Sequence, residues 1–166
     1  MKVSRIALLL AAAAVLEFFV GRSPYRTFVP VDWFLLVTAT VSRSGDFVRA
    51  VLTGAVAGSL EDAASPLIGL NAFAKAVIGY ALTLVSVRVA FGGALAVGAA
   101  LFVASLANEA LVALLAALLV QSPVVILTRD AFWRAAATGI AGGALESAWN
   151  FPWRDWWQRR RLRRLR

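Results

Sequence analysis

The sequence predicts an all-α membrane protein in which six transmembrane helices form one bundle, followed by a short tail. The first observation is composition, because 61% of the 166 residues are hydrophobic and only 16% are charged. Soluble domains contain about 45–50% apolar and about 25% charged residues, and a soluble domain this small cannot bury so much apolar surface. The second observation is that the apolar residues fall into six runs, separated by Gly, Pro and charged residues.

The six runs are consistent with membrane spans, which need roughly 20 apolar residues each. The expected spans cover about residues 4–20, 30–41, 47–62, 67–87, 93–120 and 130–149, and residues 151–166 form the tail. The breaks between them are the segment from Gly21 to Pro30, the polar stretch 42–46, Ser65-Pro66, Arg88 with Gly92-Gly93, and residues 121–123. The second span is short, and the fifth is long enough to tilt.

Two of these segments have an alternative interpretation. Lys2 and Arg5, followed by an apolar and alanine-rich run, also fit a secretory signal. The run continues through Phe18 and Phe19, so an uncleaved first span is expected. The stretch 93–120 could be two short pieces hinged at residues 108–109, but a single long tilted helix is the simpler expectation.

Lys and Arg placement predicts the orientation. Six spans put both termini on one side, which then collects twelve Lys and Arg residues, seven of them in the tail, against four on the other side. The positive-inside rule therefore predicts that both termini are cytoplasmic.

The residue types exclude many kinds of chemistry. The chain has no Cys and no His, which removes disulfides, thiolate nucleophiles, Ser-His-Asp triads and the usual soft metal ligands. It also has no P-loop, glycine-rich dinucleotide turn or carboxylate cluster for two metals. We therefore expect no enzymatic activity, no cofactor and no resident metal.

Polar and small residues inside the spans follow helical spacing. Gly54, Gly58 and Asp62 form one stripe at i, i+4 and i+8, and a second stripe follows on the fourth span. Small residues at this spacing allow close helix approach. The residues assigned to helix packing or partner contact are Gly54, Gly58, Asp62, Ser65, Gly69, Asn71, Lys75 and Gly79. One interpretation pairs Asp62 with Lys75 inside the hairpin; the other leaves Asp62 at the water interface while Lys75 snorkels outward.

Other polar residues at membrane depth are functional candidates, because burying them is costly. They are Glu17, Asn108, Glu109, Glu146 and Asn150. Carboxylates such as Glu109 and Glu146 can form a proton or cation path, but they more often are hydrogen-bonded acids or partners of a nearby Arg.

The tail combines interfacial aromatic residues with a basic run. Tryptophan belongs at the headgroup level, and arginines just cytoplasmic of a span are attracted to anionic lipid. The expected headgroup contacts are Trp153, Trp156, Trp157, Arg159, Arg160, Arg161, Arg163, Arg164 and Arg166. Because the tail is tethered beside a membrane, we expect it to bind lipid and not nucleic acid.

The segment from Gly58 to Ala72, followed by Gly79-Tyr80, resembles the central signature of the rod shape-determining membrane protein family MreD. The shared pattern is a Gly-rich helix, an Asp, a Ser-containing turn, and a Gly-Leu with a polar residue that opens the next helix. The segments Pro30–Asp32 and Arg129–Trp133 also resemble family features. Lys75 and the Ala/Arg-rich composition depart from the family pattern.

The resemblance implies a non-enzymatic scaffold subunit of the bacterial cell-elongation complex in the inner membrane, where it takes part in peptidoglycan biosynthesis and cell shape. Its implied partners are MreC and, through MreC, RodA with its transpeptidase partner and MreB filaments. The implied fold is similar to the six-helix substrate-binding components of energy-coupling-factor transporters. The alternative function is therefore a substrate-binding component for a small, vitamin-type molecule.

Overall fold

The computed structural model describes residues 2–22, 30–63, 68–88, 93–120 and 128–150. Within these ranges all the regular structure is helical, which confirms the all-α class. The helices are α1 (Val3–Arg22), α2 (Trp33–Ser42), α3 (Phe47–Asp62), α4 (Leu70–Arg88), α5 (Ala94–Val120) and α6 (Arg129–Asn150). Their bounds follow the six expected segments closely, and α5 is one continuous helix, so the hinged alternative is wrong.

Polar side chains and glycines determine where several helices begin. Asp32 and Asp46 are the N-caps of α2 and α3, and each side chain accepts a hydrogen bond from the backbone three residues on. Such caps satisfy backbone donors that lack a partner within the helix. Gly69 and Gly93 directly precede α4 and α5 with φ angles of +98° and +111°, a conformation that glycine adopts without steric cost.

The centre of the fold is α2, which contacts all the other helices. Two apolar clusters meet on it. One joins α2 to α4 and α5 through residues such as Leu35, Ile78 and Leu101, and the other joins α2 to α1 and α3 through Val37 and Ala57. Because α2 is surrounded, seven of its ten residues are buried, which explains why so short a helix is almost wholly apolar.

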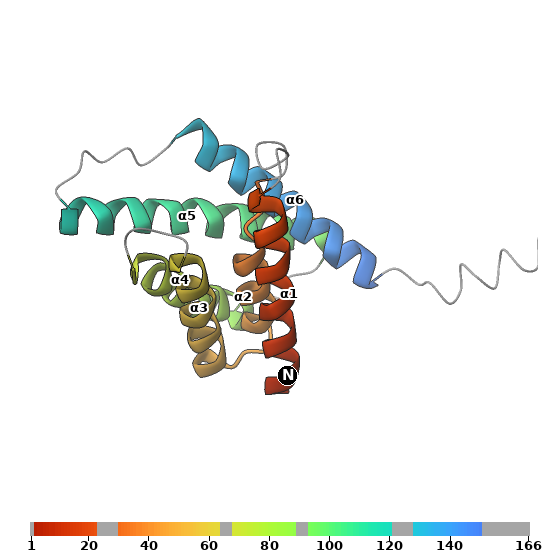
Figure 1. The fold of residues 1–166 in the computed structure, drawn as a ribbon. Helices are drawn as coiled ribbons and strands as arrows, with labels where there is room; N and C mark the ends of the chain where they lie inside the picture. The colour runs from red at the N-terminus through yellow and green to blue at the C-terminus, as the bar shows by residue number, and fades with distance from the viewer. Residues whose placement is uncertain (1, 23–29, 64–67, 89–92, 121–127, 151–166) are drawn as a thin grey trace, which may run out of the picture.

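The last two helices pack as a pair through glycine. A Cβ added to Gly98 would lie 2.9 Å from the carbonyl oxygen of Gly139, so these backbones approach closely. Figure 1 shows α5 lying crosswise to α1, with α6 running diagonally next to α5. The arrangement therefore differs from a bundle of six near-parallel helices, because the paired α5 and α6 pack across the other four instead of alongside them.

Two helices are long and apolar enough to cross a membrane. They are Leu70–Arg88 and Ala94–Leu119, whose most apolar stretches have mean hydropathies of 1.5 and 2.1. Large apolar side chains also cover outward faces, and on α3 they form a stripe at four-residue spacing. The stripe consists of Val48, Leu52, Val56 and Leu60, which are 43–68% exposed.

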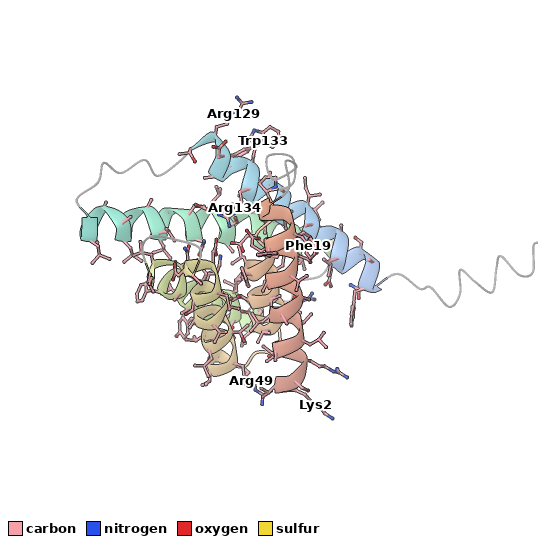
Figure 2. All side chains as sticks on the ribbon, in the orientation of Figure 1. Lys2, Phe19, Arg49, Arg129, Trp133 and Arg134 are labelled. Carbon is pink, nitrogen blue, oxygen red and sulfur yellow. The ribbon has the colours of Figure 1, made fainter. Side chains whose placement is uncertain are left out.

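Basic residues mark one end of the fold. Figure 2 shows Lys2 and Arg49 at the end where α1 and α3 begin, with Arg129 and Trp133 at the opposite end. This separation agrees with the grouping of charges expected from the sequence. Arg134 was grouped with the outer residues, but its side chain lies inside the fold, as described next.

Candidate functional site

Lys75 lies at the centre of a buried ionic network. Its side chain has no exposed surface, and its ammonium group contacts two carboxylates. Nζ donates a hydrogen bond of 2.6 Å to Oδ2 of Asp32 and lies 2.9 Å from Oε2 of Glu61. Asp32 comes just before α2 and Glu61 from the last turn of α3, so Lys75 ties α4 to two other elements.

Arg134 of α6 extends the network. Its guanidinium donates one hydrogen bond of 2.8 Å to Oε1 of Glu61 and another of 3.1 Å to Oε1 of Glu109 on α5. The contacts form an alternating chain of charges, which we call the ionic chain, in the order Asp32, Lys75, Glu61, Arg134 and Glu109. Each buried charge thus has an opposite partner, as burial requires.

Asp32 has a second and a third role besides pairing with Lys75. Its Oδ1 accepts a hydrogen bond of 2.8 Å from the backbone of Leu35, which caps α2. Its own backbone N–H donates to the hydroxyl of Thr138 on α6, at 3.0 Å. A single residue that is 2% exposed therefore connects α2, α4 and α6.

Asp62 does not pair with Lys75, and the pairing considered from the sequence is wrong. Its carboxylate instead accepts hydrogen bonds of 2.9–3.1 Å from the backbones of Gly69, Asn71 and Ala72 and from the Asn71 side chain. These donors lie at the start of α4, where backbone N–H groups have no helical partner. The snorkelling alternative is wrong as well, because Asp62 is 1% exposed and Lys75 is fully buried.

The cap made by Asp62 gives a testable prediction. Substituting Asp62→Ala leaves several buried donors unpaired, at about 1–3 kcal/mol for an unsatisfied group. We expect faster hydrogen exchange at the amides of Gly69 and Ala72 and a lower unfolding temperature. The matched control is Asp46→Ala, which removes a more exposed cap that accepts one backbone bond. Equal losses for the two variants would contradict the role assigned to Asp62.

The small residues assigned to helix packing face the hairpin of α3 and α4. A Cβ added to Gly54 or Gly58 would lie 2.2–2.3 Å from the carbonyl oxygen of Lys75 or Asn71, and one added to Gly79 would lie 2.7 Å from that of Ala50. These glycines therefore serve internal packing in this structure. Ser65 lies outside the described residues.

The remaining polar residues separate into different surroundings. Glu146 pairs with Arg43 and also accepts a hydrogen bond of 2.8 Å from Asn150. Both Glu109 and Glu146 thus have an arginine partner, in agreement with that alternative. Asn108 is 2% exposed, and its Oδ1 has no hydrogen-bond partner among the described residues. Glu17 is half-buried on α1, and the tail residues from Trp153 to Arg166 lie outside the described residues.

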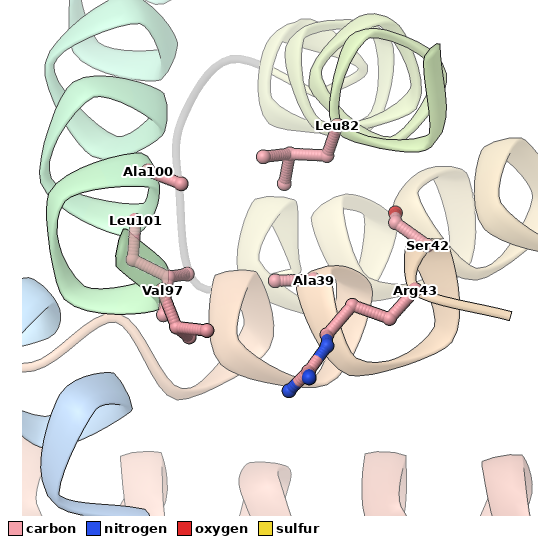
Figure 3. Close-up of a pocket in the computed structure, with 7 residues that line it drawn as sticks. All are labelled: Ala39, Ser42, Arg43, Leu82, Val97, Ala100 and Leu101. Atoms are coloured by element: carbon pink, nitrogen blue, oxygen red, sulfur yellow. The ribbon is translucent and has the colours of Figure 1, made fainter. Parts of the chain in front are cut away.

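A small cavity lies elsewhere, where α2, α4 and α5 meet (Figure 3). Its volume is about 20 Å³ and its lining is almost entirely apolar, with Arg43 at the edge. That volume corresponds to roughly one water molecule. The described residues also hold no group of His, Cys, Asp and Glu side chains arranged for a metal ion.

No protein-family model, curated protein or solved structure matches this chain. The function is therefore argued from the residues and contacts described above.

The ionic chain was only partly foreseen from the sequence. Glu109 and Lys75 were candidates, whereas Asp32, Glu61 and Arg134 were not assigned to a site. The available signal was that Asp32, Lys75 and Arg134 each lie within the first turns of an apolar helix, or just before it. Charges at such positions on neighbouring helices can meet at the same end of a bundle.

Proposed function

We propose that this chain is an integral membrane scaffold subunit of the bacterial cell-elongation complex, as its resemblance to the MreD family implies. It crosses the inner membrane six times with both termini in the cytoplasm. It docks MreC, and through MreC it connects to RodA, its transpeptidase partner and MreB. The tail binds anionic lipid.

The observation that carries this proposal is the hairpin formed by the residues that resemble the family signature. Gly58 allows the backbones of α3 and α4 to touch, and Asp62 caps α4 through four hydrogen bonds. Each conspicuous residue of the motif thus has a structural task and none has a catalytic one. This supports a scaffold whose signature maintains the fold.

Membrane insertion is supported by the surface and the interior together. Apolar side chains point outward, including the α3 stripe of Val48, Leu52, Val56 and Leu60. The charged groups of the ionic chain are instead directed at one another. This is the distribution expected in lipid, where ionisable residues turn to the protein interior.

The internal use of the glycines moves the expected partner contact to another surface. Because Gly54 and Gly58 are covered by α4, a partner helix cannot reach them. The outward stripe of α3 is available, and its four-residue spacing fits the contact line of a helix.

Co-purification with MreC tests the proposal. We expect MreC to remain bound to the full-length chain in mild detergent, and binding to fall at least tenfold when Leu52 and Val56 are both replaced by Ser. The matched control is Val15 with Leu16 on α1, also exposed and replaced in the same way. No association under several mild conditions would argue strongly against the scaffold function.

The alternative function, a vitamin-type substrate-binding component, makes a different prediction. A substrate would raise the unfolding temperature of the purified protein or remain bound through purification. Because the members of the ionic chain pair with one another, they do not by themselves support a substrate site.

A further inference from the structure

The charges around Arg134 do not balance. The ionic chain contains three carboxylates and two cations. A fourth carboxylate, Glu17 of α1, is half-buried and lies within electrostatic reach of the same group of residues. With every group ionised, four negative charges would face two positive ones.

Glu17 is the member of this group that no cation contacts. Within the described ranges its carboxylate makes no ion pair and no hydrogen bond, whereas Glu61 and Glu109 both bind the guanidinium of Arg134. The described charges that act on Glu17 are Arg134, Asp32, Glu61 and Lys75. Two of these four repel a negative charge, and both cations are already divided between carboxylates.

An ionised carboxylate in this position is energetically unfavourable. Removing a charge from water costs several kcal/mol even after the protein relaxes, and a group without a compensating partner neutralises instead. Neutralisation of a carboxylate requires only a proton. Neither a metal ion nor a nucleophile is needed.

We propose that the ionic chain and Glu17 together form a proton-binding site, in which the Glu17 carboxyl group holds one proton at neutral pH. Deprotonation places a second uncompensated negative charge beside Arg134. The ionised Glu17 then competes with Glu61 and Glu109 for that guanidinium. Proton binding on α1 is thereby coupled to the contacts that join α3, α5 and α6.

Infrared difference spectroscopy between neutral and alkaline pH tests this site on the full-length chain in lipid nanodiscs. A protonated carboxyl group has a carbonyl stretching band that an ionised carboxylate lacks. We expect one such band at neutral pH, lost at alkaline pH and absent from Glu17→Gln. The control Glu146→Gln, whose carboxylate pairs with Arg43 at another place in the fold, keeps the band.

Each other result overturns the proposal. A wild-type protein without the band carries no bound proton of this kind, and a band that disappears in Glu109→Gln instead assigns the proton to Glu109. Because glutamine is close in shape to the neutral acid, Glu17→Gln should unfold at the wild-type temperature at neutral pH. Failure of that variant to fold would mean that an ionised carboxylate is required.

Discussion

Replacing Lys75 by Met lowers the stability of the folded protein more than any other single charge removal among the described residues. Met fills a similar volume but leaves Asp32 and Glu61 without their shared cation. Removing one partner of a buried ion pair costs about 3–5 kcal/mol. The free energy of unfolding, measured by titrating the purified protein with SDS in mixed micelles, should fall by that amount.

The matched control for Lys75 is Arg49→Met. Arg49 pairs with Asp46, but 46% of its side-chain surface is exposed, and exposed pairs contribute about 0–1 kcal/mol. The double variant Lys75→Met with Asp32→Asn should recover part of the loss, because it removes one of the two stranded charges. If Lys75→Met and Arg49→Met were equally stable, the ionic chain would not hold the helices together.

Substituting Gly58→Ala separates α3 from α4. The added methyl group would lie 2.2 Å from the carbonyl oxygen of Asn71 and 2.5 Å from the Cα of Ala72. Both are backbone atoms that cannot move without displacing α4 and the cap made by Asp62. Overpacking typically costs about 1–3 kcal/mol, and this case belongs at or above the upper end of that range.

Gly143→Ala is the control for this clash, since its Cβ would lie no closer than 3.1 Å to a neighbouring atom. We expect Gly143→Ala to accumulate in membranes at nearly the wild-type level, while Gly58→Ala is strongly reduced. Equal levels of the two variants would show that the α3–α4 contact is looser than described.

The sequence was sufficient to predict the helices and several of their ends. Apolar runs and helix-breaking residues carry that information locally, so the helix α5 and the starts of α2 and α3 at Asp32 and Asp46 agree with expectation. The stripe of Gly54 and Gly58 also predicted close packing correctly, because helical spacing decides which residues share one face.

The ionic chain could not be predicted in the same way. Lys75 and Asp32 are 43 positions apart, and Arg134 and Glu61 are 73 apart. Spacing along one helix does not reveal which neighbouring helix supplies a partner. Asp62 was paired with the wrong group for a related reason, since the spacing considered side chains and omitted the unpaired backbone donors at the start of α4.

The arrangement of α5 was also beyond the sequence. Its Gly and Ala residues predict close packing, but they do not specify the partner or the crossing angle. The structure pairs Gly98 of α5 with Gly139 of α6 and places α5 crosswise to α1. Whether α5 crosses the membrane is therefore the sharpest question for the six-span topology.

Single-cysteine labelling of the membrane topology tests the account most directly, because the chain has no cysteine of its own. Ser23→Cys, Ser65→Cys and Ser122→Cys should each react with a membrane-impermeant maleimide in intact spheroplasts. Ser4→Cys and Ser44→Cys should react only after lysis. Labelling of Ser122→Cys only after lysis would show that α5 does not span, and protection of Ser23→Cys and Ser65→Cys as well would contradict the six-span membrane protein altogether.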